Sequence, residues 1–232
     1  MIKTATLQSV MHSRTYATVM AAFVATVLVS NISSAAKIVD FGVSLYGIPL
    51  AFDAGTLLFP LSYIFGDILT ELYGFRGSRR VIWTGFVLSA AMSAYLFLVG
   101  IMPGEVAWLQ YAGNDAYAAI LGGVSSGGIV IASLSAYLMG ELSNSFSMER
   151  IKQWTQGKFL PLRTIGSTLV GQGIDTVSFV LIACTFNVFP WEIAVSLILA
   201  NYIFKVGIEV LFTPMTIVVI RWLQKIETDP IA

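Results

Sequence analysis

The sequence is poor in the residues that build metal sites, disulfide frameworks and nucleophile–base pairs. It contains one cysteine and one histidine among 232 residues. Disulfides need paired cysteines, and most transition-metal sites need several His or Cys ligands, so we expect neither. Cys184 lies in an apolar run, far along the chain from His12, and is predicted to be a packing residue. We therefore expect no catalytic residues, no metal and no cofactor.

Charged side chains are also scarce. They make up 11% of the chain, whereas soluble domains carry about 25%. With 56% hydrophobic residues and a mean hydropathy of +0.81, the chain is predicted to be a membrane protein in contact with the lipid bilayer. The basic and acidic residues number 13 each, so the molecule has no overall field that would attract nucleic acid directly.

Six stretches are apolar and long enough to cross a bilayer, which takes about 20 helical residues. The fourth and sixth exceed one crossing and are expected to tilt or protrude, and the connections leave no room for a second domain. The sequence thus predicts an all-α, polytopic membrane protein with a single six-helix domain over residues 1–232. The predicted spans are Thr15–Ala36, Leu50–Tyr73, Val81–Met102, Tyr117–Phe146, Thr164–Phe186 and Trp191–Leu223.

The basic residues predict the orientation, because short cytoplasmic loops are enriched in Lys and Arg. On one side the loops contain a single basic residue, Lys37, whereas the other side has eleven, so both termini are expected in the cytoplasm. An alternative is that the first span is a signal peptide with a cleavage site near residues 34–36. The basic residues assigned to the cytoplasmic side are Lys3, Arg14, Arg76, Arg79, Arg80, Arg150, Lys152, Lys158, Arg163, Arg221 and Lys225.

Seven ionisable residues fall within the predicted spans. A charge near the bilayer centre costs at least about 2.5–3.5 kcal/mol, so these side chains should face a shared interior or the headgroups. Charge inside a membrane indicates a functional site. The seven residues are Asp53, Asp67, Glu71, Glu141, Asp175, Lys205 and Glu209.

A ligand pocket is predicted between the fifth and sixth spans at mid-depth. Gln172 lies one helical turn from Asp175, and Asn201 and Glu209 flank Lys205 at four-residue spacing, so each group forms one polar stripe. The alternative is a structural ion pair, in which Lys205 neutralises Asp175 or Glu209. One lysine cannot neutralise two carboxylates, and this favours the pocket.

A second polar layer is predicted nearer the cytoplasmic side. Asp67 and Glu71 lie one turn apart in the second span, and Glu141, Asn144 and Tyr137 share a face of the fourth. We expect Asp67 and Glu71 to act as a gate or in coupling, and the other three to contribute to the gate or to the substrate wall. The alternative for the acidic pair is a salt-bridge cluster at a helix end, with the basic residues Arg76, Arg79 and Arg80.

Prolines and small residues indicate bends and close packing. Pro60 and Pro214 fall within predicted spans, where proline introduces a kink. Glycines and serines are concentrated at 122–128 and 166–173, which favours close helix packing and leaves homodimerisation open. A stripe of Ala17, Ala21 and Ala25 on the first span suits docking of another helix. No nucleotide-binding motif is present, so ATP use by this chain alone is not expected.

Four segments resemble the queuosine precursor transporter family of bacterial inner-membrane proteins. The resemblance implies import of 7-cyano-7-deazaguanine, and also of 7-aminomethyl-7-deazaguanine, for queuosine synthesis in tRNA. It further implies six helices similar to the substrate-binding subunits of energy-coupling-factor transporters, acting without an ATPase, in the inner membrane. The segments are FPLSYIFGDILTELYG with the following Arg pair (59–80), GELSNSF (140–146), RTIGSTLVGQGIDT (163–176) and 205–214.

The chemistry of the predicted pocket suits such a ligand. A guanine-like ring presents a ring N–H beside an exocyclic amine, and a carboxylate such as Asp175 or Glu209 accepts from both. The ring carbonyl needs a donor, available from Gln172, Asn201 or Lys205. Flat ring faces need aromatic walls, for which the candidates are Phe65, Tyr137, Phe179 and Phe204.

Alternating access is the expected mechanism, and it leaves proton coupling and facilitated diffusion both open. One alternative is the substrate-binding subunit of an ATP-driven vitamin or nucleobase transporter. Another is a membrane-embedded enzyme that uses Asp67 or Glu71 in acid–base catalysis. The missing nucleophile–base pair and the lack of an extramembrane domain argue against the enzyme, and the family resemblance argues for a transporter.

Overall fold

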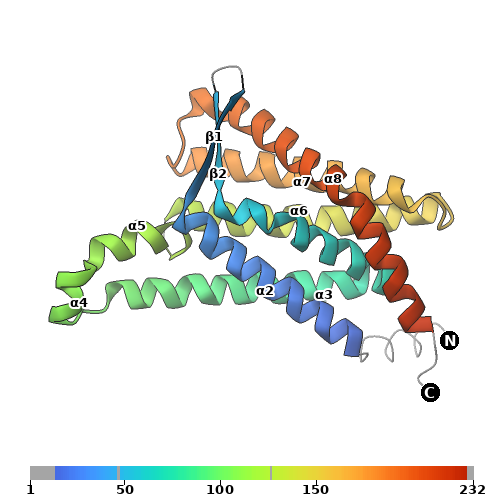
Figure 1. Cartoon of the computed structure of the whole chain (residues 1–232), viewed down its shortest axis with the longest axis horizontal. Helices are drawn as coiled ribbons and strands as arrows, with labels where there is room; N and C mark the ends of the chain where they lie inside the picture. Colours follow the sequence, from blue (N-terminus) through green and yellow to red (C-terminus); the bar gives the residue numbers. More distant parts are fainter. Residues whose placement is uncertain (1–13, 46–47, 126, 229–232) are drawn as a thin grey trace.

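The computed structural model describes residues 14–45, 48–125 and 127–228, and it forms a bundle of long helices (Figure 1). Five helical stretches in the described residues are long and apolar enough to cross a membrane. This confirms the predicted polytopic helical bundle. In chain order the elements are α2 (Arg14–Ala36), β1 (Ile38–Leu45), β2 (Ile48–Asp53), η1 (Ala54–Leu57), α3 (Phe59–Ile101), α4 (Val106–Tyr111), α5 (Gly113–Ser125), α6 (Gly128–Trp154), α7 (Leu160–Thr185), η2 (Trp191–Ile193) and α8 (Ala194–Thr228).

A β-hairpin occupies the start of the predicted second span. Strands β1 and β2 pair antiparallel, with Ile38 opposite Asp53 and Leu45 opposite Ile48. Helix α3 begins after this hairpin and η1, so the predicted start of the span at Leu50 is wrong. Hydropathy alone does not separate an apolar strand from an apolar helix. Pro60 lies in the first turn of α3, where no hydrogen-bond donor is lost, and the predicted mid-span kink is therefore also wrong.

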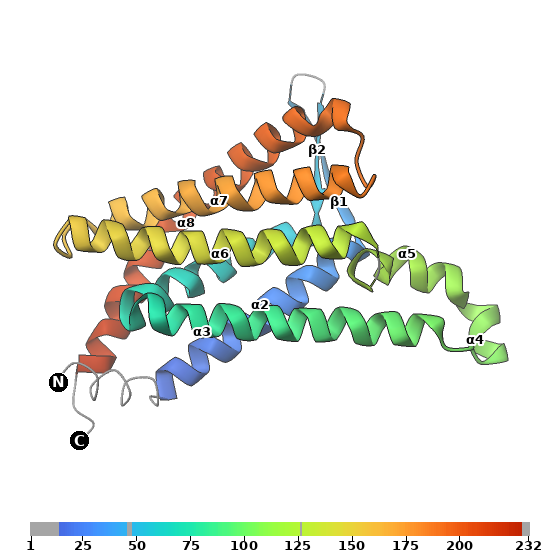
Figure 2. The same ribbon diagram turned by 180° about the vertical axis from the view of Figure 1, so that it is seen from behind.

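Helix α3 reverses direction at Gly74 and forms two arms. Gly74 has φ 68° and ψ 173°, a backbone conformation that glycine adopts without steric cost. The first arm (residues 59–73) and the second arm (residues 75–101) lie folded back on each other in both views (Figures 1 and 2). The α3 helix therefore accounts for two of the predicted spans.

The first arm of α3 lies in the interior of the bundle. Ile68 and Leu69 are almost fully buried, together with Phe23 of α2 and Ile220 of α8. The ring of Tyr16 on α2 packs edge-on against that of Tyr73, with centroids 4.9 Å apart. Because other helices surround this arm, its polar side chains face protein.

Helices α6 and α7 run antiparallel in close contact (Figure 2). A Cβ added at Gly140 would lie 2.6 Å from the Cβ of Asp175, and one added at Gly171 would lie 2.6 Å from the Cβ of Asn144. Real Cβ atoms do not approach so closely, so glycine is what lets the two backbones meet. The predicted role of small residues in packing is confirmed at this pair.

Two other predicted spans differ from the observed helices. The fourth, predicted as continuous from Tyr117 to Phe146, is divided by Gly127 at φ 81° into α5 and α6. The sixth begins as a 3₁₀ turn at Trp191 and continues as α8 through Pro214. The start of α2 and the end of α8 lie at the same end of the bundle (Figure 1). Cys184 is buried among apolar side chains, as predicted.

Candidate functional site

A cluster of buried polar side chains lies where the first arm of α3 meets α6, α7 and α8. The first arm contributes Asp67, Thr70 and Glu71, all less than 9% exposed. Their burial on one short helix requires polar partners on the neighbouring helices, since a buried polar group without a partner costs free energy. Those neighbours contribute Glu141, Asn144, Ser145, Arg163, Thr164, Ser167, Thr168, Gln172, Thr176 and Glu209.

Three acidic side chains form the centre of this cluster, and we call Asp67, Glu141 and Glu209 the carboxyl trio. They come from α3, α6 and α8, and Asp67 lies near enough to the other two for their charges to interact. The Oε2 atom of Glu141 lies 3.3 Å from the position that a Cβ on Gly66 would occupy. Glycine at 66 therefore leaves room for this carboxyl group against α3.

Neutral donors contact two members of the trio. Thr168 donates to Oε1 of Glu209 over 2.5 Å, and Gln172 donates to Oε2 over 3.5 Å. Asn144 donates to Oδ1 of Asp67 over 3.4 Å. The two amide bonds are long for N–H···O contacts, which are commonly near 2.9–3.0 Å. Both amides can therefore be released to another acceptor at little cost.

Several acceptor atoms of the cluster have no donor among the described residues. They belong to side chains that are at most 5% exposed, so bulk water does not reach them. A buried polar atom left without a partner costs about 1–3 kcal/mol, and a set of them indicates a site that a ligand or water completes. The acceptors are Asp67 Oδ2, Glu141 Oε2, Asn144 Oδ1 and Gln172 Oε1.

The predicted pocket between α7 and α8 is divided in the structure. Lys205 pairs with Asp175 over 2.6 Å, with side chains 18% and 14% exposed, so the ion pair considered as the alternative is present. Glu209 instead belongs to the carboxyl trio, and Gln172 donates to it. Asn201 is exposed on α8 and is not brought to the cluster. The first turns of α8 instead contribute Ala194, Leu197 and Ile198 to the apolar cluster around Cys184.

The predicted aromatic walls lie mostly away from the cluster. Phe179 packs against Phe189 with centroids 6.1 Å apart, beside the small apolar cluster around Cys184. Phe204 is 40% exposed. Tyr137, one turn before Glu141 on α6, donates its hydroxyl to the carbonyl of Ile82 over 3.1 Å.

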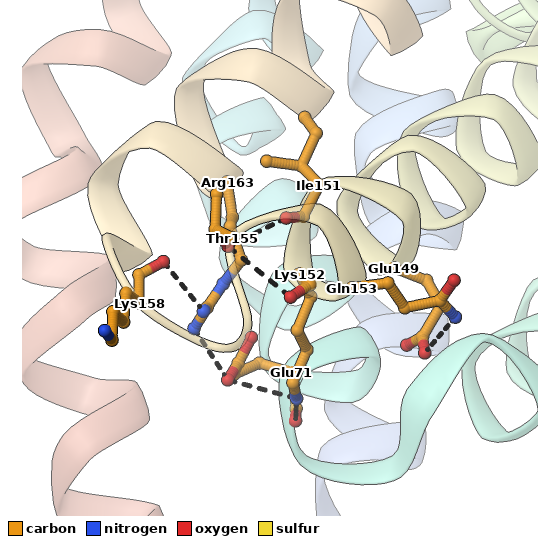
Figure 3. A network of polar contacts seen from close by, with 8 residues as sticks. All are labelled: Glu71, Glu149, Ile151, Lys152, Gln153, Thr155, Lys158 and Arg163. Carbon is orange, nitrogen blue, oxygen red and sulfur yellow. Dashed lines mark hydrogen bonds and ion pairs between the residues drawn. The ribbon is translucent and has the colours of Figure 1, made fainter.

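A second polar group ties the end of the first arm to α6 and α7 (Figure 3). Oε1 of Glu71 accepts from Arg163 over 2.9 Å and from Lys152 over 3.1 Å, and Lys152 also donates to the carbonyl of Glu71 over 2.7 Å. The alternative considered for Asp67 and Glu71 was a helix-end salt-bridge cluster with Arg76, Arg79 and Arg80. A salt bridge is present at Glu71, but its partners are Arg163 and Lys152, and the three arginines are exposed. Gly74 turns the chain before them and directs them outward.

Comparison with known proteins places this chain in a family. Residues 53–219 match the family described as "putative vitamin uptake transporter". The chain belongs to this family. It is 25% identical over 177 residues to the "Probable queuosine precursor transporter" of Bacillus subtilis (strain 168), covering 74% of this chain and 72% of that one. No solved structure matches. The resemblance inferred from sequence is confirmed, and with its spanning helices this vitamin uptake transporter family member is a multi-pass protein of the bacterial inner membrane.

Sequence reasoning missed two contributors to the site of this transporter. Arg163 was counted as a loop residue, yet it is 3% exposed and bound to Glu71. Thr168 lies within the segment RTIGSTLVGQGIDT (163–176), and its type and position alone predict no role for it. A signal was present, since Thr164, Thr168 and Gln172 recur at four-residue spacing and so share one face of α7.

Proposed function

We propose that this transporter imports the queuosine precursors 7-cyano-7-deazaguanine and 7-aminomethyl-7-deazaguanine by alternating access. One observation supports the proposal: in the described part of the chain, buried acceptors without donors belong to one polar cluster on three neighbouring helices, α3, α6 and α7. The printed name of the Bacillus subtilis relative supports the class of ligand. The binding residues we assign are Asp67, Glu141, Asn144, Gln172 and Glu209.

The ligand's hydrogen-bonding groups complement these atoms. A guanine-like ring presents a ring N–H and an exocyclic amine as adjacent donors, which one carboxylate accepts together. Asp67 has one oxygen without a donor among the described residues, and its other oxygen accepts only the long bond from Asn144. The ring carbonyl needs a donor, and the amides of Asn144 and Gln172, now on long bonds, can supply it. A ligand without the paired donors would leave a buried carboxyl unsatisfied, and that penalty supports selectivity.

Asp175 and Lys205 have a supporting role in this proposal. Their 2.6 Å bond joins α7 to α8 directly beside Gln172 and Glu209, and so it fixes the spacing across which the ligand binds. Tyr137 positions the second arm of α3 through Ile82. Phe179 on α7 packs against Phe189 and so supports the connection from α7 to α8. Asn201 has no part in the proposed site.

The Glu71 ion-pair group is proposed as the inner gate. It joins the end of the first arm to the α6–α7 connection, and Lys152 and Arg163 both belong to the basic loops assigned to the cytoplasm. Opening toward the cytoplasm would require these bonds to break or to move together. In this orientation both termini are cytoplasmic and the chain works as a single domain.

A substrate-binding subunit with an energising partner is the second candidate. Ala17, Ala21 and Ala25 are exposed along the outer face of α2, which gives another helix a surface for close approach. Purification from native membranes distinguishes the two. An ATPase that co-purifies would favour the second candidate, and a homodimer or a monomer would favour the first.

The test of the proposed function is uptake of both labelled precursors by bacteria that cannot synthesise them. Cells producing the transporter are expected to accumulate label and restore queuosine in tRNA, because the site accepts the guanine-like edge. Gln172→Ala and Asp67→Asn variants should accumulate less, at matched membrane abundance. Uptake that is unchanged in both variants would reject the assigned site, and uptake of neither precursor by the parent chain would reject the function.

A further inference from the structure

The carboxyl trio has no basic partner among the described residues. Asp67, Glu141 and Glu209 are 1%, 5% and 6% exposed. The donors that reach them are a hydroxyl and two amides, none of which carries charge. The ion pairs found in the described part of the chain lie elsewhere, at Lys152–Glu71, Arg163–Glu71 and Lys205–Asp175.

The groups that surround the trio do not supply the missing charge. Tyr63 on α3 and Tyr137 on α6 lie near enough to interact with its charges, and neither is a cation. Asp175 on α7 adds a further carboxylate, whose partner Lys205 on α8 is held at 2.6 Å. On α2, the titratable group that packs against α3 is Tyr16, which donates to the carbonyl of Gly77. Lys152 on α6 and Arg163 on α7, which contact the first arm of α3, are bound to Glu71.

Buried carboxylates without a cation are costly, and neighbouring ones repel each other. Glu141 is the member for which this matters most. Its Oε2 has no donor among the described residues, whereas Glu209 accepts from two side chains and Asp67 from one. Glu141 also lies directly against the backbone at Gly66. A positive charge that comes from outside and binds at Glu141 would therefore supply the partner that this carboxyl group does not find among the described residues.

We propose that each transport cycle carries one positive charge inward on Glu141, as a proton or as part of the ligand. With the neutral 7-cyano ligand the charge is a proton, which binds Glu141 from the outer solution and leaves to the cytoplasm with the ligand. With the 7-aminomethyl ligand it is the ligand's own ammonium group, since an alkyl amine is protonated at neutral pH. One ligand and one positive charge move in either case. This inference rests on the proposed function and adds its coupling.

The first experiment uses the full-length transporter in liposomes that contain a pH-sensitive dye. Uptake of the 7-cyano ligand should acidify the interior, and equal uptake of the 7-aminomethyl ligand should not. A membrane potential, negative inside, should accelerate both. Uptake of the 7-cyano ligand without acidification, or uptake that follows a sodium gradient instead, would overturn the proposal. Uptake of neither ligand would instead reject the proposed function, so the two failures are distinguishable.

The second experiment uses Glu141→Gln, which has nearly the same shape and cannot hold the extra charge. Acidification with the 7-cyano ligand should disappear, and uptake of the 7-aminomethyl ligand should fall by about 30-fold or more, because its ammonium group loses a buried partner. Glu149→Gln is the matched control, since it lies two turns further along α6 and contacts Gln153 near the surface. Equal losses for both ligands in Glu141→Gln would overturn the assignment to Glu141. The comparison of ligands in the parent chain tests the coupling even if this variant does not fold.

Discussion

Arg163 and Glu71 form an ion pair of 2.9 Å between side chains that are 3% and 4% exposed and 92 residues apart in sequence. This pair connects the reversal of α3 to the start of α7. Because a buried charge is costly once its partner is lost, the geometry of the inner end of the bundle depends on both residues.

Replacing Arg163 by Gln is expected to destabilise the protein by about 3–5 kcal/mol, as is usual when one partner of a buried ion pair is removed. Because Lys152 still contacts Glu71 in this variant, we expect the loss of stability to lie near the lower end of that range. Thermal unfolding in detergent measures the effect. Arg76→Gln is the control, because Arg76 is exposed just after the same turn. Equal stability of the two variants would show that the buried pair contributes nothing.

Replacing Gly171 by Ala is expected to force α6 and α7 apart and to move Asn144. The added Cβ would lie 2.6 Å from the Cβ of Asn144 and 3.2 Å from the carbonyl of Gly140. Overpacking of this kind costs about 1–3 kcal/mol, and ligand affinity should fall as well, because Asn144 belongs to the proposed site.

The control for that substitution is Gly207→Ala on α8, where nothing lies within 4 Å of the added Cβ. Alanine is a better helix former than glycine, so this variant should keep its stability or gain up to about 1 kcal/mol. Thermal unfolding and ligand binding are measured on both proteins. A loss as large in Gly207→Ala would mean that glycine matters for a reason other than close packing.

Replacing Thr168 by Val should raise the apparent KM for uptake by about 10-fold, since Glu209 loses its 2.5 Å hydrogen bond and a lost partner of a buried charged group costs about 1.5–3 kcal/mol. Thr168→Ser keeps the hydroxyl and should transport normally. Thr185→Val, at an exposed position on the same helix, is the control. If Ser and Val at 168 behave alike, the hydroxyl has no role in the site.

Asp175 and Lys205 offer a direct test of ion pair against pocket. Lys205→Met alone leaves Asp175 partly buried without a cation and should reduce stability, whereas Lys205→Met combined with Asp175→Asn removes both charges and should recover most of it. Uptake in the double variant should persist if the pair is a support. A double variant that is stable and inactive would return both residues to the binding site.

The positions of polar residues along the helices could be predicted from the sequence, and their partners could not. Asp67, Glu141 and Glu209 were identified because charge is rare and costly in apolar spans. The sequence predicts a pocket that Glu209 shares with Lys205, whereas in the structure Glu209 contacts Thr168 and Gln172. Residue spacing describes the faces of one helix, and the rotation of α8 about its axis is set by its packing against the other helices. Charge counting placed Arg163 in a loop, since a sequence does not reveal that a basic side chain at a helix start points inward.

The path of the chain was predictable where hydropathy and length agree. They agree for α2 and α7, which match the predicted spans to within a few residues. They disagree around Leu50, where an apolar segment pairs as a strand, and at Gly74, where one residue with positive φ converts a long helix into two arms. Both features depend on backbone geometry, which average hydropathy does not report.

The reversal at Gly74 has a consequence for how this protein is made. The first arm of α3 has 15 residues and spans about 22 Å at 1.5 Å per residue, less than the roughly 30 Å of a hydrocarbon core. It also carries two acidic residues that find their hydrogen-bond partners on α6 and α7, both synthesised later. During biogenesis this arm lacks what it needs to remain among lipids, so its final placement must follow the insertion of the C-terminal half.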